Sequence, residues 1–228
     1  MIISDRLATI AGIILVVGMP IVLVASPLFA FVTPSFVRHE YSQRGFPPAG
    51  RFGGDERLRL SDTILHYLRG KRARDALATM RTEGGEFALT AGEVEHLADV
   101  KAVMWGIFFT YAVAVVTEIV CLALLWRSSQ RHLLPARLRQ GVWLTATLIG
   151  LVAISSLIDF EVFFTRFHQV FFPPNTWVFD PSDTLIQLYP LPFWVDAVYK
   201  IAAVTCFELV LVYALSLALG RSAWTRNA

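Results

Sequence analysis

Residues Asp159 to Trp194 read DFEVFFTRFHQVFFPPNTWVFDPSDTLIQLYPLPFW, and the rest of the chain is organised around this segment. It lies between two apolar runs and combines many aromatic side chains with one histidine, His168. Such a segment is too polar to cross a bilayer and too apolar to be a solvated linker. Aromatic rings are enriched at the level of the lipid headgroups. The stretch is therefore predicted to lie at a membrane–water interface.

The composition of the whole chain supports a membrane protein. The 228 residues are 55% hydrophobic and 17% charged, whereas soluble domains carry about 25% charged residues. The apolar residues gather in four runs, each long enough for a helix that crosses roughly 30 Å of hydrocarbon. We predict an all-α, multi-pass membrane protein with four transmembrane helices in a single domain, 1–228. The spans are expected at about 10–33, 101–126, 142–158 and 196–219.

Charge distribution predicts how the chain is oriented. The segment between the second and third runs, WRSSQRHLLPARLRQ, is short and carries four arginines and no acid. Short basic loops stay in the cytoplasm. We therefore expect a cytoplasmic loop at about 127–140, cytoplasmic N- and C-termini, and two extracytoplasmic connections at about 38–100 and 159–195. The net charge of +2 indicates no nucleic-acid partner.

Two helix starts are expected in the first connection. Leu60 to Gly70 has the pattern of a short helix, with Ser61 as its N-cap and Gly70 at its end. Thr90 and Glu93 have the spacing of a capping box, which predicts a helix that starts near Thr90 and continues through the second span. Arg81 to Thr90 (RTEGGEFALT) is expected to form a turn and a brief extended piece.

His168 lies in FFTRFHQVFF, where phenylalanines recur at helical spacing. This pattern predicts an interfacial helix with an apolar stripe, which consists of Phe160, Phe164, Phe167 and Phe171. One interpretation makes His168 only a polar tip of that helix. The other makes it a general base in a partly desolvated pocket, since imidazole titrates near neutral pH.

His96 is expected at the outer end of the second span, beside acidic residues and Lys101. A neighbouring carboxylate such as Glu93 or Asp99 would fix the imidazole tautomer. The alternatives are a solvated helix start with ion pairs, or a metal site. The pattern is neither HExxH nor a Cys/His motif, so we predict no metal and no cofactor. His96 and His168 share one membrane depth, and the topology permits contact between them.

Other polar and sulfur-bearing residues have simpler interpretations. Asp159 ends the third span, and Asn175 and Trp177 are expected in an ordered loop after the double proline. Acids inside a membrane are costly, so Glu118 and Glu208 are predicted to form interhelical hydrogen bonds. The two cysteines, Cys121 and Cys206, lie in apolar runs and are expected to be buried.

Three motifs together resemble one bacterial membrane family. They are EVEHLADVK from Glu93, DFEVFFTRFHQVFFPPNTW from Asp159, and DPSDTLIQLYPLPFW from Asp180. Their combination is similar to the lipoprotein intramolecular transacylase family, and the resemblance spans nearly the whole chain. It implies a diacylglyceryl lipoprotein as substrate and transfer of the sn-2 acyl chain from its ester to the α-amine of the N-terminal cysteine.

The resemblance also implies a location and a set of site residues. The enzyme would be a bacterial acyltransferase of the cytoplasmic membrane, surrounded by membrane lipids, with its active site on the extracytoplasmic face. His96 and His168 would be the general acid and base, with the order left open. Glu93 or Asp99 would orient His96, while the oxyanion would be held by one of Lys101, Arg166, Asn175 and Trp177.

Two other functions and the oligomeric state stay open at this point. A non-catalytic membrane chaperone or regulator would bind partners through the large outer connection and would tolerate loss of both histidines. A lipid ester hydrolase would admit water to the site and release a free fatty acid.

Overall fold

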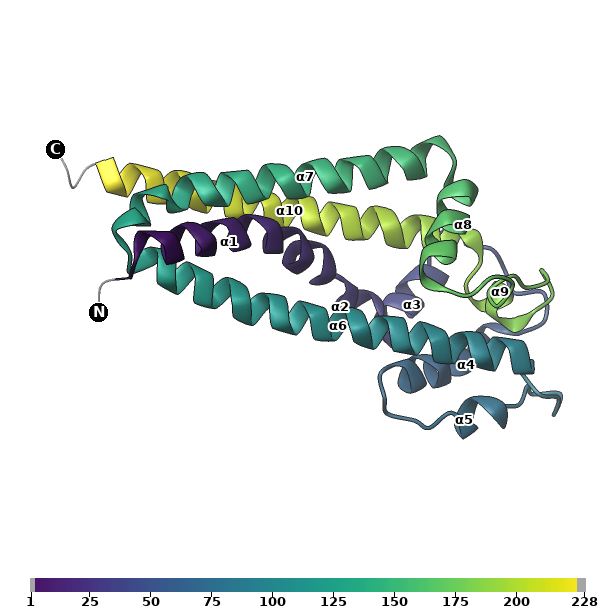
Figure 1. Cartoon of the computed structure of the whole chain (residues 1–228). Coiled ribbons are helices and arrows are strands. Elements are labelled where there is room, and N and C mark those ends of the chain that lie inside the picture. The colour runs from purple at the N-terminus through teal and green to yellow at the C-terminus, as the bar shows by residue number, and fades with distance from the viewer. Residues whose placement is uncertain (1–2, 225–228) are drawn as a thin grey trace. The chain divides into compact units, whose positions relative to one another are not determined.

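The computed structural model describes residues 3–224, in which the regular elements are helices and one isolated antiparallel bridge joins Arg81 to Phe87 (Figure 1). The bridge closes the turn that the sequence predicted there. In chain order the elements are α1 (Asp5–Ala25), α2 (Leu28–Phe31), α3 (Pro34–Tyr41), α4 (Gly54–Leu68), α5 (Asp75–Ala78), α6 (Ala91–Trp126), the 3-10 helix η1 (Ser129–Leu133), α7 (Leu134–Ile158), α8 (Phe160–Phe171), α9 (Thr184–Leu188) and α10 (Leu191–Trp224).

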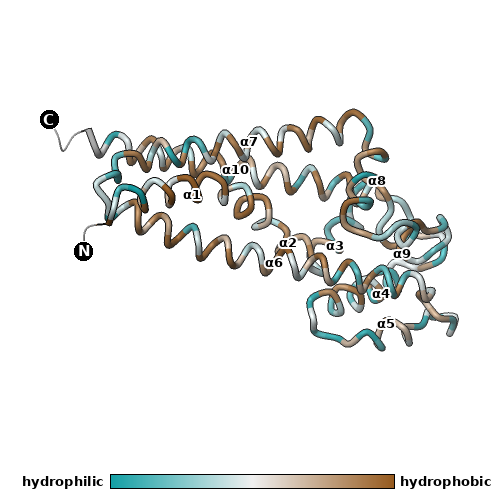
Figure 2. Tube along the Cα trace, viewed as in Figure 1, coloured by the Kyte–Doolittle hydropathy of each residue, from teal (hydrophilic) through white to brown (hydrophobic). Residues whose placement is uncertain are grey.

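Within residues 3–224, four helical stretches are long and apolar enough to cross a membrane. They are Asp5–Phe31, Ala91–Trp126, Ser129–Ile158 and Leu191–Arg221. Figure 2 shows long hydrophobic stretches along α1, α6, α7 and α10. The predicted all-α class with four long apolar helices is confirmed. The membrane side of the termini and connections stays a prediction, as do the single domain and its span limits.

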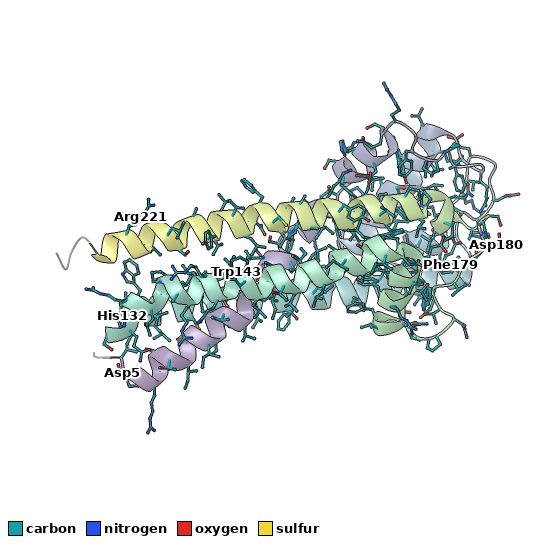
Figure 3. The ribbon with its side chains drawn as sticks, turned by 90° about the horizontal axis from the view of Figure 1, so that it is seen from above. Asp5, His132, Trp143, Phe179, Asp180 and Arg221 are labelled. Carbon is teal, nitrogen blue, oxygen red and sulfur yellow. The ribbon has the colours of Figure 1, made fainter. Side chains whose placement is uncertain are left out.

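The chain forms two compact units, of which the first contains residues up to Pro27, Ile107–Ser155 and the residues from Lys200 onward. Its core packs small and branched apolar side chains from four helices, including Leu15, Leu125, Leu138 and Leu209. At one end of this unit, where Figure 3 labels Asp5, His132 and Arg221, Ser129 Oγ donates to Asp5 Oδ1 at 2.5 Å. This bond joins η1 to the start of α1.

Polar residues inside the first unit follow the predictions only in part. Ser26 Oγ donates to Glu208 Oε1 at 2.6 Å, which agrees with the interhelical hydrogen bond predicted for Glu208 without naming its partner. Glu118 is buried, but Oε1 has no hydrogen-bond partner among the described residues. Its carboxylate instead packs against Gly18, where an added Cβ would lie 2.1 Å from Oε1. Cys121 is buried as predicted, whereas Cys206 is exposed and that prediction is wrong.

The second unit contains Leu28–Gly106 and Ser156–Tyr199. Part of its core packs Val37, Leu65 and Phe193 together. Arg57 is buried beside this cluster and donates to the carbonyl oxygens of Pro47 and Gln187 at 2.8 Å each. A buried guanidinium is costly unless its donors are used, so these bonds stabilise the segment that leads to α10.

One predicted helix start in this unit is wrong. The helix of Leu60–Gly70 begins at Gly54, with Gly53 as N-cap, and Ser61 lies inside it. The hydroxyl of Ser61 is 2.6 Å from Tyr41 Oη instead of capping the helix. The first turn contains Asp55 and Glu56, and acids there are favoured by the helix dipole. The helix is therefore longer than its apolar pattern indicated.

Candidate active site

The start of α6 positions His96. The predicted capping box is present: Thr90 Oγ1 accepts from the Glu93 amide at 3.2 Å, and Glu93 Oε2 accepts from the Thr90 amide at 2.8 Å. Glu93 is only 1% exposed, and its other oxygen accepts from the Leu185 amide at 2.7 Å. One carboxylate thus satisfies amides at the starts of α6 and α9, and it fixes the helix turn on which His96 lies.

The short helix α8 positions His168. Asp159 is its N-cap and accepts from the Val162 amide at 3.0 Å. At the other end of the helix, His168 Nδ1 lies 2.8 Å from the carbonyl oxygen of Phe164. A carbonyl oxygen only accepts, so Nδ1 carries the hydrogen. In the neutral ring the lone pair is therefore on Nε2.

The two histidines meet within the second unit. Their ring centroids are 6.2 Å apart with the planes inclined by 26°, and each residue is 8% exposed. Aromatic side chains enclose them. The ring centroid of His96 lies 4.9 Å from that of Phe172 and 5.5 Å from that of Phe179, which Figure 3 labels. The ring centroid of His168 lies 4.1 Å from that of Phe164 and 4.8 Å from that of Trp177. The centroids of Phe172 and Phe167 lie 5.4 Å and 5.6 Å away.

Burial sets the protonation state of His168. The apolar surroundings lower the pKa of its imidazole below the ordinary value of 6.5, since burial outweighs the Phe164 carbonyl, which favours the charged ring. His168 is therefore neutral near pH 7 and can accept a proton.

Two buried nitrogens of this site lack a partner within the described part of the chain. They are Nδ1 of His96 and Nε1 of Trp177. Buried polar atoms almost always have a hydrogen-bond partner, and a buried indole N–H usually finds one. The Trp177 nitrogen can only donate, whereas the His96 nitrogen can donate or accept according to the tautomer. Within the described chain, each atom is thus an unsatisfied hydrogen-bonding group of the site.

The three charged residues predicted to act with His96 are Glu93, Asp99 and Lys101. Glu93 binds backbone amides, as described above, and no recorded bond within residues 3–224 joins it to the imidazole. Asp99 is half-buried, and no hydrogen bond or ion pair within the same range links it to His96. Lys101 Nζ lies 4.2 Å from the ring centroid of Tyr67. Orientation of His96 by a carboxylate is thus not among the described contacts.

The remaining sequence-derived residues lie on α8 and the loop after it. Arg166 donates to Gln169 Oε1 at 3.2 Å, one turn along the same helix. Asn175 adopts a left-handed backbone with φ of 64°, which asparagine tolerates better than most residues. It lies in the turn after the double proline and directs the chain toward Trp177, whose ring packs on His168.

Two aromatic residues that line the site were not predicted from the sequence. They are Phe172 and Phe179, whose rings contact His96. Phe164 and Phe167 were interpreted as part of an apolar stripe, whereas both rings contact His168. The available signal was the density of aromatic residues on both sides of His168. Among residues 3–224, no group of three or more His, Cys, Asp or Glu side chains has the arrangement of a metal site.

Comparison with protein-family models shows which family the chain belongs to. The model for "Lipoprotein intramolecular transacylase Lit" matches residues 12–194, which is most of the sequence. The chain belongs to the lipoprotein intramolecular transacylase family. With four long apolar helices and this family membership, it is a multi-pass membrane protein.

Individual relatives are similar to this chain over most of its length. An uncharacterized protein of Aquifex aeolicus (strain VF5) is 28% identical over 205 residues, covering 88% of this chain and 90% of the relative. The solved structure of the membrane-integral lipoprotein intramolecular transacylase Lit from Bacillus cereus has a TM-score of 0.81 at 20% identity, over 97% of this chain and 100% of that chain. A variant of that protein with one histidine replaced by arginine has a TM-score of 0.74 at 19% identity, over 97% and 95% of the two chains. At these identities, the structures show a common fold.

Proposed function

We propose that the protein moves the sn-2 acyl chain of a diacylglyceryl lipoprotein to the α-amine of the same lipoprotein's N-terminal cysteine. An ester C–O bond breaks and an amide C–N bond forms. One proton leaves the amine, and one proton ends on the glyceryl oxygen. The product is an N-acyl, S-monoacylglyceryl lipoprotein. The observation that carries the proposal is the pair of buried histidine rings 6.2 Å apart in a member of this family.

His168 is assigned the role of general base. Its Nδ1–H is engaged with the Phe164 carbonyl, which leaves Nε2 with a lone pair. An α-amine has a pKa near 8, so a base is needed to remove its proton as the amide bond forms. A neutral imidazole is well suited to this step near neutral pH.

His96 is assigned to the glyceryl oxygen that leaves. A neutral imidazole accepts a proton at one nitrogen and donates from the other. His96 can thus pass the proton taken by His168 to the alkoxide, after which both rings are neutral again. The Nδ1 of His96, which is buried without a partner in the described chain, supports its use in a contact with substrate.

Trp177 is assigned to the carbonyl oxygen of the migrating acyl group. That oxygen becomes negative in the tetrahedral intermediate, and a buried donor aimed at it stabilises the transition state. The indole Nε1 is such a donor, and its ring lies 4.8 Å from that of His168. Lys101 and Arg166, the cationic candidates, have the neighbours Tyr67 and Gln169.

The reacting groups favour transfer without an external energy source. Conversion of an ester to an amide is downhill, and amine and ester belong to one substrate, so correct orientation supplies much of the rate. Phenylalanine and tryptophan rings around both histidines exclude water, which would otherwise hydrolyse the ester. We place the reaction on the extracytoplasmic face of the bacterial cytoplasmic membrane, where the diacylglyceryl group lies in the lipid.

The test is expression in a bacterial host that lacks its own N-acylation, followed by mass spectrometry of lipoprotein N-termini. The wild type is expected to produce the N-acyl, S-monoacylglyceryl form, and His96→Gln and His168→Gln should not. His66→Gln, a histidine that pairs with Asp62 on α4, is the matched control and should retain product. Release of free fatty acid without N-acylation would indicate a hydrolase. An unmodified lipoprotein in the wild-type strain would contradict the proposal.

A further inference from the structure

A second polar feature of the molecule lies away from the histidines, at the end of α4. Arg69–Arg74 reads RGKRAR, and every residue of this segment is exposed. We call it the cationic loop. Four of its six residues are basic, and the first acid that follows is Asp75.

Backbone bonds hold the first half of the cationic loop in one conformation. Gly70 has φ of +76°, its amide donates to Tyr67 at 2.9 Å, and the Lys71 amide donates to His66 at 2.8 Å. These two bonds define a Schellman motif, which ends a helix with a left-handed residue. Lys71 therefore leaves the helix in a fixed direction.

Trp105 fixes the level of the cationic loop along α6. Its indole Nε1 donates to the Leu68 carbonyl oxygen at 3.0 Å, and a Cβ added at Gly70 would lie 3.1 Å from its ring. The residue is 51% exposed. The sequence that follows, GIFFTYAVAVVT, has no charge before Glu118. A tryptophan at such a boundary lies at the membrane–water interface, and the loop bonded to it lies at the same level.

The contacts of Arg69 also place the cationic loop near the end of an apolar run. Arg69 Nη1 donates to the Val32 carbonyl oxygen at 3.0 Å, and Val32 directly follows the apolar helix α2. The loop thus touches residues next to the ends of two apolar runs.

Two cations of the loop remain available. Arg74 pairs with Glu95, and Arg69 is engaged as described. The side chains of Lys71 and Arg72 are exposed, with no hydrogen bond or ion pair to any residue between 3 and 224. Lys101, over the Tyr67 ring, adds a further positive charge beside the end of α4.

We propose that the cationic loop binds the phosphate of an anionic phospholipid headgroup. Free cations at headgroup level attract anionic lipids, and each one contributes about a fivefold gain in affinity. The fixed Lys71 and the arginine beside it offer donors for one phosphate, while the exposed ring of Trp105 contacts the glycerol region. This inference does not depend on the proposed acyl transfer, because its residues do not contact either histidine in the described structure.

The experiment is native mass spectrometry of the full-length protein, purified in detergent and supplied with equal amounts of phosphatidylglycerol and phosphatidylcholine that carry identical acyl chains. The wild type is expected to retain phosphatidylglycerol in preference. Lys71→Gln/Arg72→Gln should lower this preference by about 25-fold, and Lys71→Arg/Arg72→Lys should keep it. Acyl transfer in detergent should be unchanged in both variants.

Two controls decide between a site and general attraction. Arg127→Gln/Arg131→Gln removes the same charge from exposed positions of the first unit. An equal loss of phosphatidylglycerol in this control would overturn the proposal, as would wild-type preference in Lys71→Gln/Arg72→Gln. Binding of inorganic phosphate as strong as that of the lipid would likewise contradict a headgroup site. Trp105→Phe, which keeps a ring beside Gly70 but removes the N–H, should lower the preference to a smaller extent.

Discussion

His168 Nδ1 donates to the carbonyl oxygen of Phe164, four residues earlier in α8, at 2.8 Å. This bond selects one tautomer of the ring and leaves Nε2 as its only basic atom. The enclosing rings lower the pKa of the imidazole. We therefore predict that His168 stays neutral as the pH falls through 6.5, where an ordinary histidine becomes half charged.

NMR of protein with isotopically labelled histidine measures this titration, and the signal of His168 is assigned from its absence in His168→Gln. A His168 signal that titrates at or above 6.5 would contradict the inference that burial keeps this ring neutral.

Trp177 tests the assignment of the oxyanion donor. Trp177→Phe keeps an aromatic ring against His168 but removes the N–H, so kcat should fall about 10²-fold while KM changes little. Trp177→Ala also removes the ring contact and should lower kcat further. Rates of N-acylated product formation with purified enzyme, measured over a range of substrate concentrations, separate the two effects. A Trp177→Phe enzyme with wild-type kcat would exclude the indole from transition-state stabilisation.

Glu93 is expected to determine the stability of the second unit. Glu93→Ala leaves the amides of Thr90 and Leu185 without their acceptor, which should lower the free energy of unfolding by about 3 kcal/mol. Thermal unfolding in detergent measures the change as a lower Tm.

The neighbouring Glu95 is the control for that measurement. It is exposed on the same helix turn and pairs with Arg74. Exposed ion pairs contribute about 0–1 kcal/mol, so Glu95→Gln should change Tm little. If both variants lower Tm equally, the buried carboxylate of Glu93 has no special role.

Gly18 tests the packing of the first unit. A Cβ at this position would overlap Glu118 Oε1, so Gly18→Ala forces the end of the Glu118 side chain to move. The substitution should destabilise the protein by about 1 kcal/mol. Glu118→Ala should make room for the methyl group and reduce the cost of Gly18→Ala in a double-mutant cycle. Gly150→Ala is the control, because nothing lies within 4 Å of its added Cβ. Additive effects of the Gly18 and Glu118 substitutions would show that the two residues do not contact each other.

The sequence predicted features whose signals are local. The four apolar helices follow from composition, and the start of α6 follows from Thr90 and Glu93, three residues apart. Glu93 also binds Leu185, 92 positions away, and no local pattern encodes that bond. The start of α4 was missed because its first residues are polar and show no apolar period.

The geometry of the site also depends on contacts between residues far apart in the sequence. The sequence identified both histidines, but their 6.2 Å separation depends on how α8 packs against α6. Thr33 caps α3 and Pro34 is its first residue, a local helix-start signal that was not used in the sequence-based prediction. The burial of Arg57 could not be inferred either, since its acceptors are backbone oxygens far along the chain.

The most direct test of the acyl shift from ester to amine is its rate in purified wild type, His96→Gln and His168→Gln, with one synthetic diacylglyceryl lipopeptide as substrate. N-acylated and starting peptides are quantified by mass spectrometry, and folding of each variant is checked by its Tm. We predict that each substitution lowers the rate by about 10²–10⁴-fold while the protein remains folded. A folded His168→Gln enzyme that forms the N-acyl product at the wild-type rate would contradict it.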